Sequence, residues 1–197
     1  NFVSLYDEGV GDEGLYSELT PPKSSGERWI GVAPFAKHKG KIYPLDCMEK
    51  VVSKLSEESR VKIFLFGSGD REREILSLWR ERYPGGISLA DKRYGFAVEL
   101  SLMSRLDVMI SMDSANMHLA SLVEVPVVSV WGATHPYCGF LGWRQSDSGV
   151  VELPLDCRPC SVFGNKPCYR KDYACLEIAP ETIVDRVKSL ETLIKEK

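Results

Sequence analysis

Residues 107–131, DVMISMDSANMHLASLVEVPVVSVW, place an apolar segment on either side of one short helical segment. The apolar segments, 107–111 and 125–131, are continuous rather than alternating in hydrophobicity. Continuous apolar runs are typical of parallel strands that helices cover on both faces. Residues 117–123 supply the helix between them, so this stretch predicts one strand-helix-strand unit with a right-handed crossover.

The same alternation continues on both sides of this unit. Apolar runs at 29–33 and 61–66 predict two further strands, and apolar residues three and four positions apart predict further helices. Together they predict an α/β fold, a Rossmann-like doubly wound parallel sheet. In the last helix, which begins at Pro180, Ile183 and Val187 are expected to cover the sheet, whereas exposure stays open for Leu190 and Ile194. The other predicted helical faces are Leu45, Met48, Val52 and Leu55; Ile75, Leu76, Trp79 and Tyr83; and Phe96, Leu100 and Met103.

The two ends of the chain differ from this core. Residues 1–28 are acidic and loop-like, so we predict a linker or interdomain segment there and one domain over 29–197. The chain lacks an initiator methionine, which suggests a fragment or a processed chain. It also lacks the basic start and apolar stretch of a signal peptide.

The overall composition disfavours two classes of protein. The 197 residues carry a net charge of −3, so no basic field favours nucleic acid as a partner. No apolar run approaches the roughly 20 residues that a transmembrane helix needs. We therefore predict a globular domain without a membrane span.

The loop after the strand at 29–33 is a candidate anion site. Ligands of an open parallel sheet bind where strands end and the following helices begin. Residues 34–44 of this loop contain three lysines, Lys41 among them, and His38. Such a cluster suits a phosphate or diphosphate, because ammonium groups add to the positive end of a helix dipole. Composition alone favours a plainer interpretation, a solvated lysine loop.

The loop after the strand at 107–111 is a second candidate. Asp113 or Ser114 can cap the next helix, and Ala115 leaves room for a ligand at free backbone N–H groups. Ser114 and His118 are four residues apart and share one helical face. A carboxylate, a hydroxyl, amides and an imidazole therefore converge within one turn. The alternative is a capped helix with a core-facing histidine.

Two other loops at this edge are weaker candidates. Residues 67–70, GSGD, form a tight turn without the GxGxxG pattern, and residues 132–136, GATHP, are polar and contain glycine. A role in the turn explains each of them equally well.

Cysteines cluster in a loop over 157–175. A four-thiolate zinc site, reduced structural thiols and oxidised pairs all stay open there, and we predict no metal. The cysteines concerned are Cys157, Cys160, Cys168 and Cys175.

Residues 113–120 read DSANMHLA, close to the pattern D-[ST]-G-x-x-H-x-A. By this pattern the sequence resembles glycosyltransferase family 9, the bacterial heptosyltransferases of lipopolysaccharide core assembly. The resemblance extends over about residues 29–196. The other matching segments are 125–128 (VPVV), 131–136 (WGATHP), 41–44 (KIYP) and the glycine turn at 67–70.

This resemblance implies one half of a GT-B glycosyltransferase, in which two Rossmann-like domains face each other across a cleft. The chain would be the C-terminal half, which binds a nucleotide-sugar donor, with ADP-heptose as the expected donor. The acceptor, the lipopolysaccharide inner core, would bind through the missing N-terminal domain, and no divalent metal or other cofactor is implied. The implied location is the cytoplasm, with peripheral association at the inner membrane left open.

The resemblance also implies donor-binding roles for five residues. The Ser114-Ala115 backbone would hold the diphosphate, His118 would support that loop or the phosphate, and Lys41 would contact the diphosphate or the sugar. Asp113 would accept hydrogen bonds from sugar hydroxyls, because a carboxylate repels a diphosphate.

Three departures limit what the resemblance carries over. Ala115 stands where glycine is usual, which matters if the backbone there needs a positive φ, and Tyr43 replaces the common tryptophan. The family's catalytic base, an aspartate, belongs to the N-terminal domain, so no residue of this chain is predicted to be catalytic. The isolated chain is therefore expected to bind donor weakly and to transfer nothing.

Two other functions stay open. One is a nucleotide-binding regulatory module without glycosyl transfer, which equal affinity for ADP and ADP-heptose would favour. The other is an interaction protein whose loop at 157–175 is held together by a zinc ion. Bound zinc whose removal leaves donor binding intact would favour this alternative.

Overall fold

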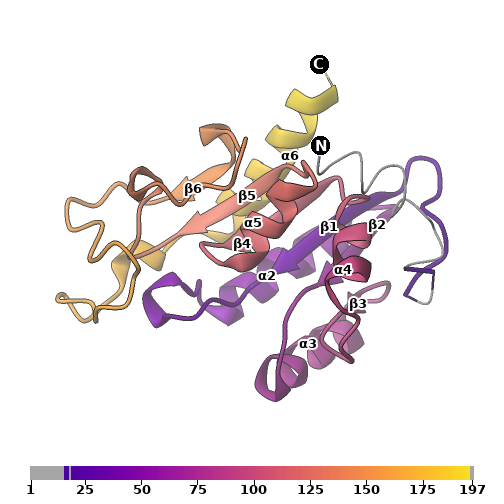
Figure 1. Cartoon of the computed structure of the whole chain (residues 1–197), viewed down its shortest axis with the longest axis horizontal. Coiled ribbons are helices and arrows are strands. Elements are labelled where there is room, and N and C mark those ends of the chain that lie inside the picture. The colour runs from indigo at the N-terminus through magenta and orange to yellow at the C-terminus, as the bar shows by residue number, and fades with distance from the viewer. Residues whose placement is uncertain (1–15, 18, 196–197) are drawn as a thin grey trace.

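The computed structural model describes residues 16–17 and 19–195, and shows one six-stranded sheet in the order β3-β2-β1-β4-β5-β6 (Figure 1). All neighbouring strands are parallel. The chain runs outward from β1 to β3, returns to β4 beside β1 and then runs to β6, so the predicted doubly wound α/β fold is confirmed. The strands are β1 Arg28–Ala33, β2 Val61–Leu65, β3 Ile87–Ser88, β4 Val108–Met112, β5 Val127–Trp131 and β6 Val150–Glu152.

Helices cover both faces of this sheet, because side chains alternate along the strands. Ile30 and Val32 of β1 join the core on one face, and Trp29 and Ala33 join the core on the other. Helices α2, α3 and α6 pack on the first face, and α4 and α5 on the second (Figure 1). The five predicted helices are all present, as α2 Leu45–Ser56, α3 Asp70–Arg82, α4 Phe96–Met103, α5 Ala115–Leu122 and α6 Pro180–Lys195.

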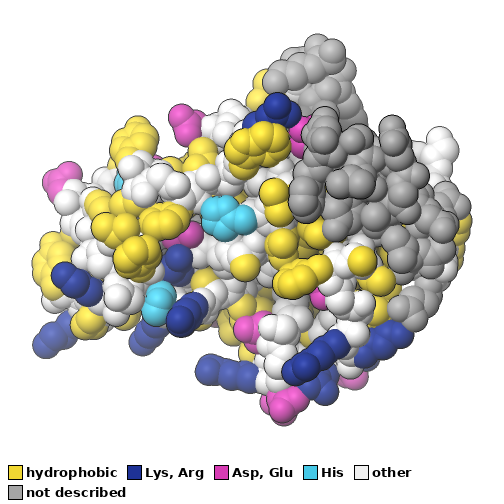
Figure 2. Space-filling model, viewed as in Figure 1, with side chains coloured by type: hydrophobic (Ala, Val, Ile, Leu, Met, Phe, Trp, Pro, Cys, Tyr) yellow, Lys and Arg dark blue, Asp and Glu magenta, His cyan; other side chains and the backbone are white. Residues whose placement is uncertain are grey.

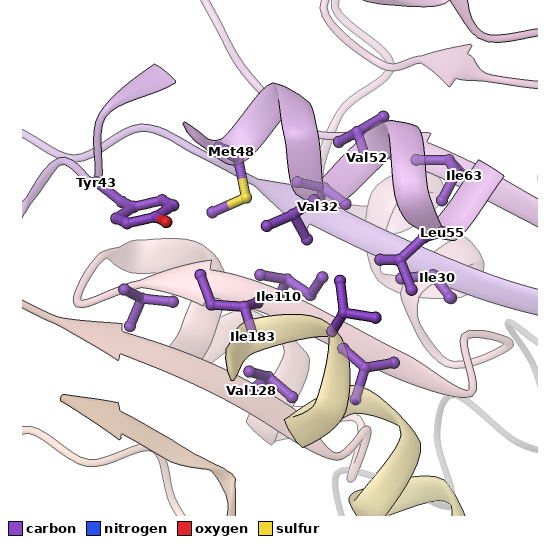
Figure 3. Close-up of a cluster of buried hydrophobic side chains, with 14 of the residues drawn as sticks. Ile30, Val32, Tyr43, Met48, Val52, Leu55, Ile63, Ile110, Val128 and Ile183 are labelled. Carbon is purple, nitrogen blue, oxygen red and sulfur yellow. The ribbon is translucent and has the colours of Figure 1, made fainter. Parts of the chain in front are cut away.

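The first face holds the core drawn in Figure 3. Met48 of α2 and Ile183 of α6 meet Ile110 of β4 there, and none of these side chains is exposed to solvent (Figure 3). Leu190 is also buried, so this part of α6 covers the sheet. The side chain of Ile194, whose exposure was left open, lies outside the described residues.

The structure differs from the sequence predictions at the sheet edges and strand ends. The strand predicted over 125–131 begins only at Val127, because Pro126 has no N–H to donate to the ladder. The strand predicted over 107–111 begins one residue later, at Val108. The Trp29 N–H donates at 2.6 Å to the Asp107 carboxylate rather than to a backbone carbonyl, so the pairing of β1 with β4 begins only at Ile30 and Val108. Strands β3 and β6 were not predicted, because two and three residues are too short to show a period.

The described residues before β1 contact the α4–α5 face. Tyr16 is buried edge-on against Trp29, with 6.2 Å between ring centroids, and Lys23 Nζ lies 2.7 Å from Asp107 Oδ2. Residues 1–15 lie outside the described residues, so the linker at 1–28 stays a prediction. No helix in the described part of the chain combines the length and apolarity needed to cross a membrane.

Candidate functional site

A cavity of about 1270 Å³ opens where the central strands end. The loops after β1, β2, β3 and β4 line it, and β1 and β4 are the neighbours between which the winding direction reverses. Ligands of doubly wound sheets bind at this point. All five predicted donor-binding residues line the cavity, namely Lys41, Asp113, Ser114, Ala115 and His118. The structure thus brings them together, while their roles in binding stay predictions.

The N-terminus of α5 presents free amides to this cavity. Ser114 occupies the N-cap position, but its side chain makes no capping hydrogen bond, and its Oγ lies 3.3 Å from Ser111 Oγ. Ser114 therefore takes the predicted cap position, but the side-chain hydrogen bond expected from Asp113 or Ser114 is not made. Within the described residues the N–H groups of Ala115 and Asn116 have no acceptor, and helix N-termini in this state bind anions.

Ala115 does not strain this helix start. Its φ is not positive, so the chain needs no glycine at the position where the family usually has one. Ala115 is exposed at the cavity, which leaves the neighbouring amides accessible.

The Lys41 ammonium pairs with the Asp113 carboxylate and is largely shielded from solvent. Lys41 Nζ lies 2.8 Å from Asp113 Oδ2, and only 15% and 4% of the two side chains are exposed. Thr134 Oγ1 donates a hydrogen bond of 2.7 Å to the same oxygen, and Oδ1 has no protein partner among the described residues. The solvated-loop interpretation is therefore wrong for Lys41. The lysine also neutralises Asp113, which lowers the repulsion between this carboxylate and a bound anion.

The other two lysines of the basic loop, Lys37 and Lys39, lie in different places relative to the cavity. Lys37 is exposed and lines the cavity, whereas Lys39 lies outside it, with Nζ 5.2 Å from the centre of the Tyr173 ring.

Figure 2 shows Lys and Arg side chains gathered along the lower edge of the face that carries α4 and α5. Hydrophobic side chains gather on the left of this view, over the loops between β5 and α6.

His118 is exposed at the cavity, so the alternative of a core-facing histidine is wrong. It has no hydrogen-bond partner in the part of the chain that the structure describes. The imidazole is therefore available to a ligand bound at the start of α5.

Glu99 was not predicted from the sequence, and it also lines the cavity, from the first turn of α4. The other carboxylates of the cavity wall all have partners: Asp70 pairs with Arg73, Asp91 with Arg80, Asp113 with Lys41, and Glu72 accepts the Ser68 N–H. Glu99 has none among the described residues, and burial raises its pKa. A half-buried carboxylate without a protein partner is an acceptor for donors on a ligand.

The weaker loop candidates have separate positions. The turn at 67–70 lines the cavity, and the positive φ of Gly69, 84°, lets the chain enter α3. The turn at 132–136 does not line the cavity, but Thr134 of this turn donates a hydrogen bond to Asp113, which does.

The cysteines of the 157–175 loop are free thiols. Burial, followed by the neighbouring thiol of Cys160, raises the pKa of Cys175 to about 11, and burial likewise raises the pKa of Cys160. These two thiols are therefore protonated at neutral pH. Among the described residues, no three His, Cys, Asp or Glu side chains are placed to hold a metal ion together.

Comparison with known proteins relates this chain to one family. Residues 12–168 match the model of glycosyltransferase family 9 (heptosyltransferase). The chain is 24% identical over 172 residues to lipooligosaccharide heptosyltransferase 2 of Campylobacter jejuni, covering 85% of this chain and 53% of that protein.

Solved structures share the fold. The ADP-heptose lipopolysaccharide heptosyltransferase II of E. coli superposes with a TM-score of 0.71 at 19% identity, over 95% of this chain and 53% of that one. The E. coli heptosyltransferase WaaC with ADP gives a TM-score of 0.64 at 16% identity, over 89% of this chain and 47% of that one.

The chain thus spans about half the length of the relatives that it matches. The family match covers the strands from β1 to β6 and every loop that lines the cavity. The chain belongs to glycosyltransferase family 9, the heptosyltransferase family.

Proposed function

We propose that this chain is the donor-binding half of a heptosyltransferase, with residues 29–197 as the donor domain and 1–28 as part of the connection to a second domain. The donor is ADP-heptose, and the acceptor is the lipopolysaccharide inner core, bound through the second domain. The observation that carries the proposal is the pair of free amides at the start of α5, which share one cavity with Lys41.

Six residues of the cavity have distinct parts in binding the donor. The amides of Ala115 and Asn116 and the Lys41 ammonium hold the diphosphate, with His118 beside them. Asp113 Oδ1 accepts a hydrogen bond from a sugar hydroxyl, because its other oxygen is taken by Lys41 and Thr134. Glu99 accepts from a hydroxyl of the ribose or the sugar.

This domain contributes to catalysis by stabilising the leaving group. In the transfer, the bond from the anomeric carbon of the heptose to the diphosphate oxygen breaks, and a bond from that carbon to the acceptor hydroxyl oxygen forms. Negative charge develops on the departing ADP, where fixed amides and an ammonium stabilise it. The acceptor proton goes to a base of the second domain, and no divalent metal takes part. The enzyme would act in the cytoplasm, with peripheral association at the inner membrane open.

Calorimetric titration of the chain with ADP-heptose, ADP and UDP-glucose tests this proposal. ADP-heptose should bind more tightly than ADP, and UDP-glucose most weakly. His118→Ala should weaken both adenine ligands by about fivefold, the value of one hydrogen bond near 1 kcal/mol.

Lys39→Ala is the matched control, because Lys39 belongs to the same basic loop but lies outside the cavity, and it should leave both affinities unchanged. Equal binding of ADP and ADP-heptose would instead support the regulatory module. Absence of binding by all three ligands would contradict the proposal.

Glu99→Gln should stabilise the protein and weaken donor binding. Because burial raises the pKa of Glu99, the folded state binds its proton more tightly than the unfolded state does. The ionised side chain therefore costs stability above that raised pKa, and the cost vanishes as the pH falls below the unfolded value. Glutamine removes the cost at pH 8, while ADP-heptose affinity should fall by about threefold to tenfold with the loss of a charge-assisted hydrogen bond.

Thermal melts at pH 8 and at low pH check this expectation together with calorimetry. Glu177→Gln, at an exposed glutamate outside the cavity, is the control and should change neither quantity. A stabilisation that is equal at both pH values would contradict the role assigned to Glu99.

A further inference from the structure

The cysteine-rich loop carries a buried arginine that no donor-binding role accounts for. The Arg158 side chain is 1% exposed, and it pairs with Glu152 Oε2 of β6 at 2.7 Å. Its Nε donates to the Gly132 carbonyl at 2.6 Å, and its Nη2 to the Thr134 carbonyl at 2.9 Å. One planar guanidinium thus binds two carbonyls, those of Gly132 and Thr134, in the turn that follows β5.

This turn reaches the donor cavity through Thr134. The Thr134 side chain is fully buried, and its hydroxyl donates to Asp113 Oδ2, the oxygen that also binds Lys41 Nζ. A continuous series of polar contacts therefore runs from Arg158 through Thr134 and Asp113 to Lys41. In addition, the Ala133 N–H donates to the Gly40 carbonyl at 2.8 Å, next to Lys41 in the chain.

The same loop also contacts Lys41 directly. Gly164 packs against the lysine stem so closely that an added Cβ would lie 2.8 Å from Lys41 Cγ and 2.9 Å from Cδ. The loop therefore limits the lysine on one side while Asp113 holds its ammonium on the other. Only a narrow set of Lys41 rotamers satisfies both contacts.

We propose that Arg158 is a positioning residue for the donor diphosphate, acting through Thr134 and Asp113 on Lys41. The inference rests on the proposed function, since it assigns the loop at 157–175 to the donor site. Arg158 does not line the cavity and so touches no ligand itself. Its effect is to keep the ammonium of Lys41 in place beside the amides of α5. A side chain that is already fixed binds an anion without a further loss of conformational entropy.

Paired titrations with ADP and adenosine test the proposal, because only ADP carries the diphosphate. Thr134→Val keeps the shape of the side chain and removes the hydroxyl. It should weaken ADP by about fivefold and leave adenosine unchanged. Thr134→Ser restores the hydroxyl and should restore ADP affinity.

Arg158→Lys keeps the charge but loses the fork, and should also lower ADP affinity more than adenosine affinity. Arg170→Lys is the matched control, because Arg170 lies in the same loop but is exposed and pairs with Asp172 rather than with the turn at 132–136. It should bind both ligands as the wild type does.

The outcomes separate the two proposals. If the wild-type chain prefers ADP and both Thr134→Val and Arg158→Lys keep that preference, the positioning role is wrong while the proposed function stands. If both variants lose affinity for ADP and adenosine equally, Arg158 supports the fold rather than the diphosphate site. If the wild type binds adenosine as tightly as ADP, the proposed function itself is contradicted, and the positioning role with it.

Discussion

Lys41→Met should lower both ADP affinity and the free energy of unfolding. The Asp113 side chain is 4% exposed, so loss of the ammonium leaves a buried carboxylate with one hydrogen bond, from Thr134. Breaking a buried ion pair in this way costs about 3 kcal/mol. Loss of one charged contact to the diphosphate should weaken ADP by roughly tenfold to a hundredfold. Urea denaturation and calorimetry measure the two effects.

A double-mutant cycle separates them. Asp113→Asn removes the buried charge, so the variant that combines it with Lys41→Met should recover much of the lost stability. It should not recover ADP affinity, because the ammonium is still missing. Full additivity of the two stability changes, or a Lys41→Met protein as stable as the wild type, would contradict the pairing.

Gly132→Ala should destabilise the chain and disturb the same site. An added Cβ would lie 2.3 Å from the Gly40 carbonyl oxygen and 2.5 Å from Leu176 Cδ2. The carbonyl belongs to the backbone and accepts the Ala133 N–H, so it cannot move without opening the contact between the two loops. We expect a loss of about 3 kcal/mol, at the upper end for overpacking, together with weaker ADP binding because Gly40 precedes Lys41.

Gly86→Ala is the control for this substitution. Gly86 has no positive φ, and the nearest atom to an added Cβ, the Tyr83 carbonyl oxygen, lies 3.2 Å away. The free energy of unfolding of the Gly86→Ala protein should change by less than about 1 kcal/mol, with ADP binding unaffected. Equal denaturation midpoints for the two alanine variants would show that the loops at Gly132 and Gly40 are not in close contact.

The central fold was predictable because its signals are local. Each of the four inner strands is a continuous apolar run, and each helix shows an apolar face. The pattern of apolar residues is therefore enough to predict these strands and helices. The edge strands β3 and β6 were missed because their two and three residues form strands only through pairing with β2 and β5. Such pairing is a tertiary effect that a short sequence window does not contain.

The candidate site divides in the same way. Lys41 and the residues at the start of α5 were predicted from their place after strands, since the ends of parallel strands share one edge. The loop that holds Thr134 was only a weaker candidate, and Arg158 was missed, because their contacts join residues 21 and 24 positions apart in the chain. The wrong prediction of a side-chain cap has a similar cause: Asp113 pairs with Lys41 instead, a residue on another loop.

A crystal structure of this chain with ADP would show directly whether the diphosphate binds at the start of α5. We expect the diphosphate at the N-terminus of α5, within hydrogen-bond distance of the Ala115 and Asn116 amides and of Lys41 Nζ. We also expect the Lys41–Asp113 pair to persist in the complex. ADP bound elsewhere, with these amides facing solvent, would contradict the assignment of this cavity as the donor site.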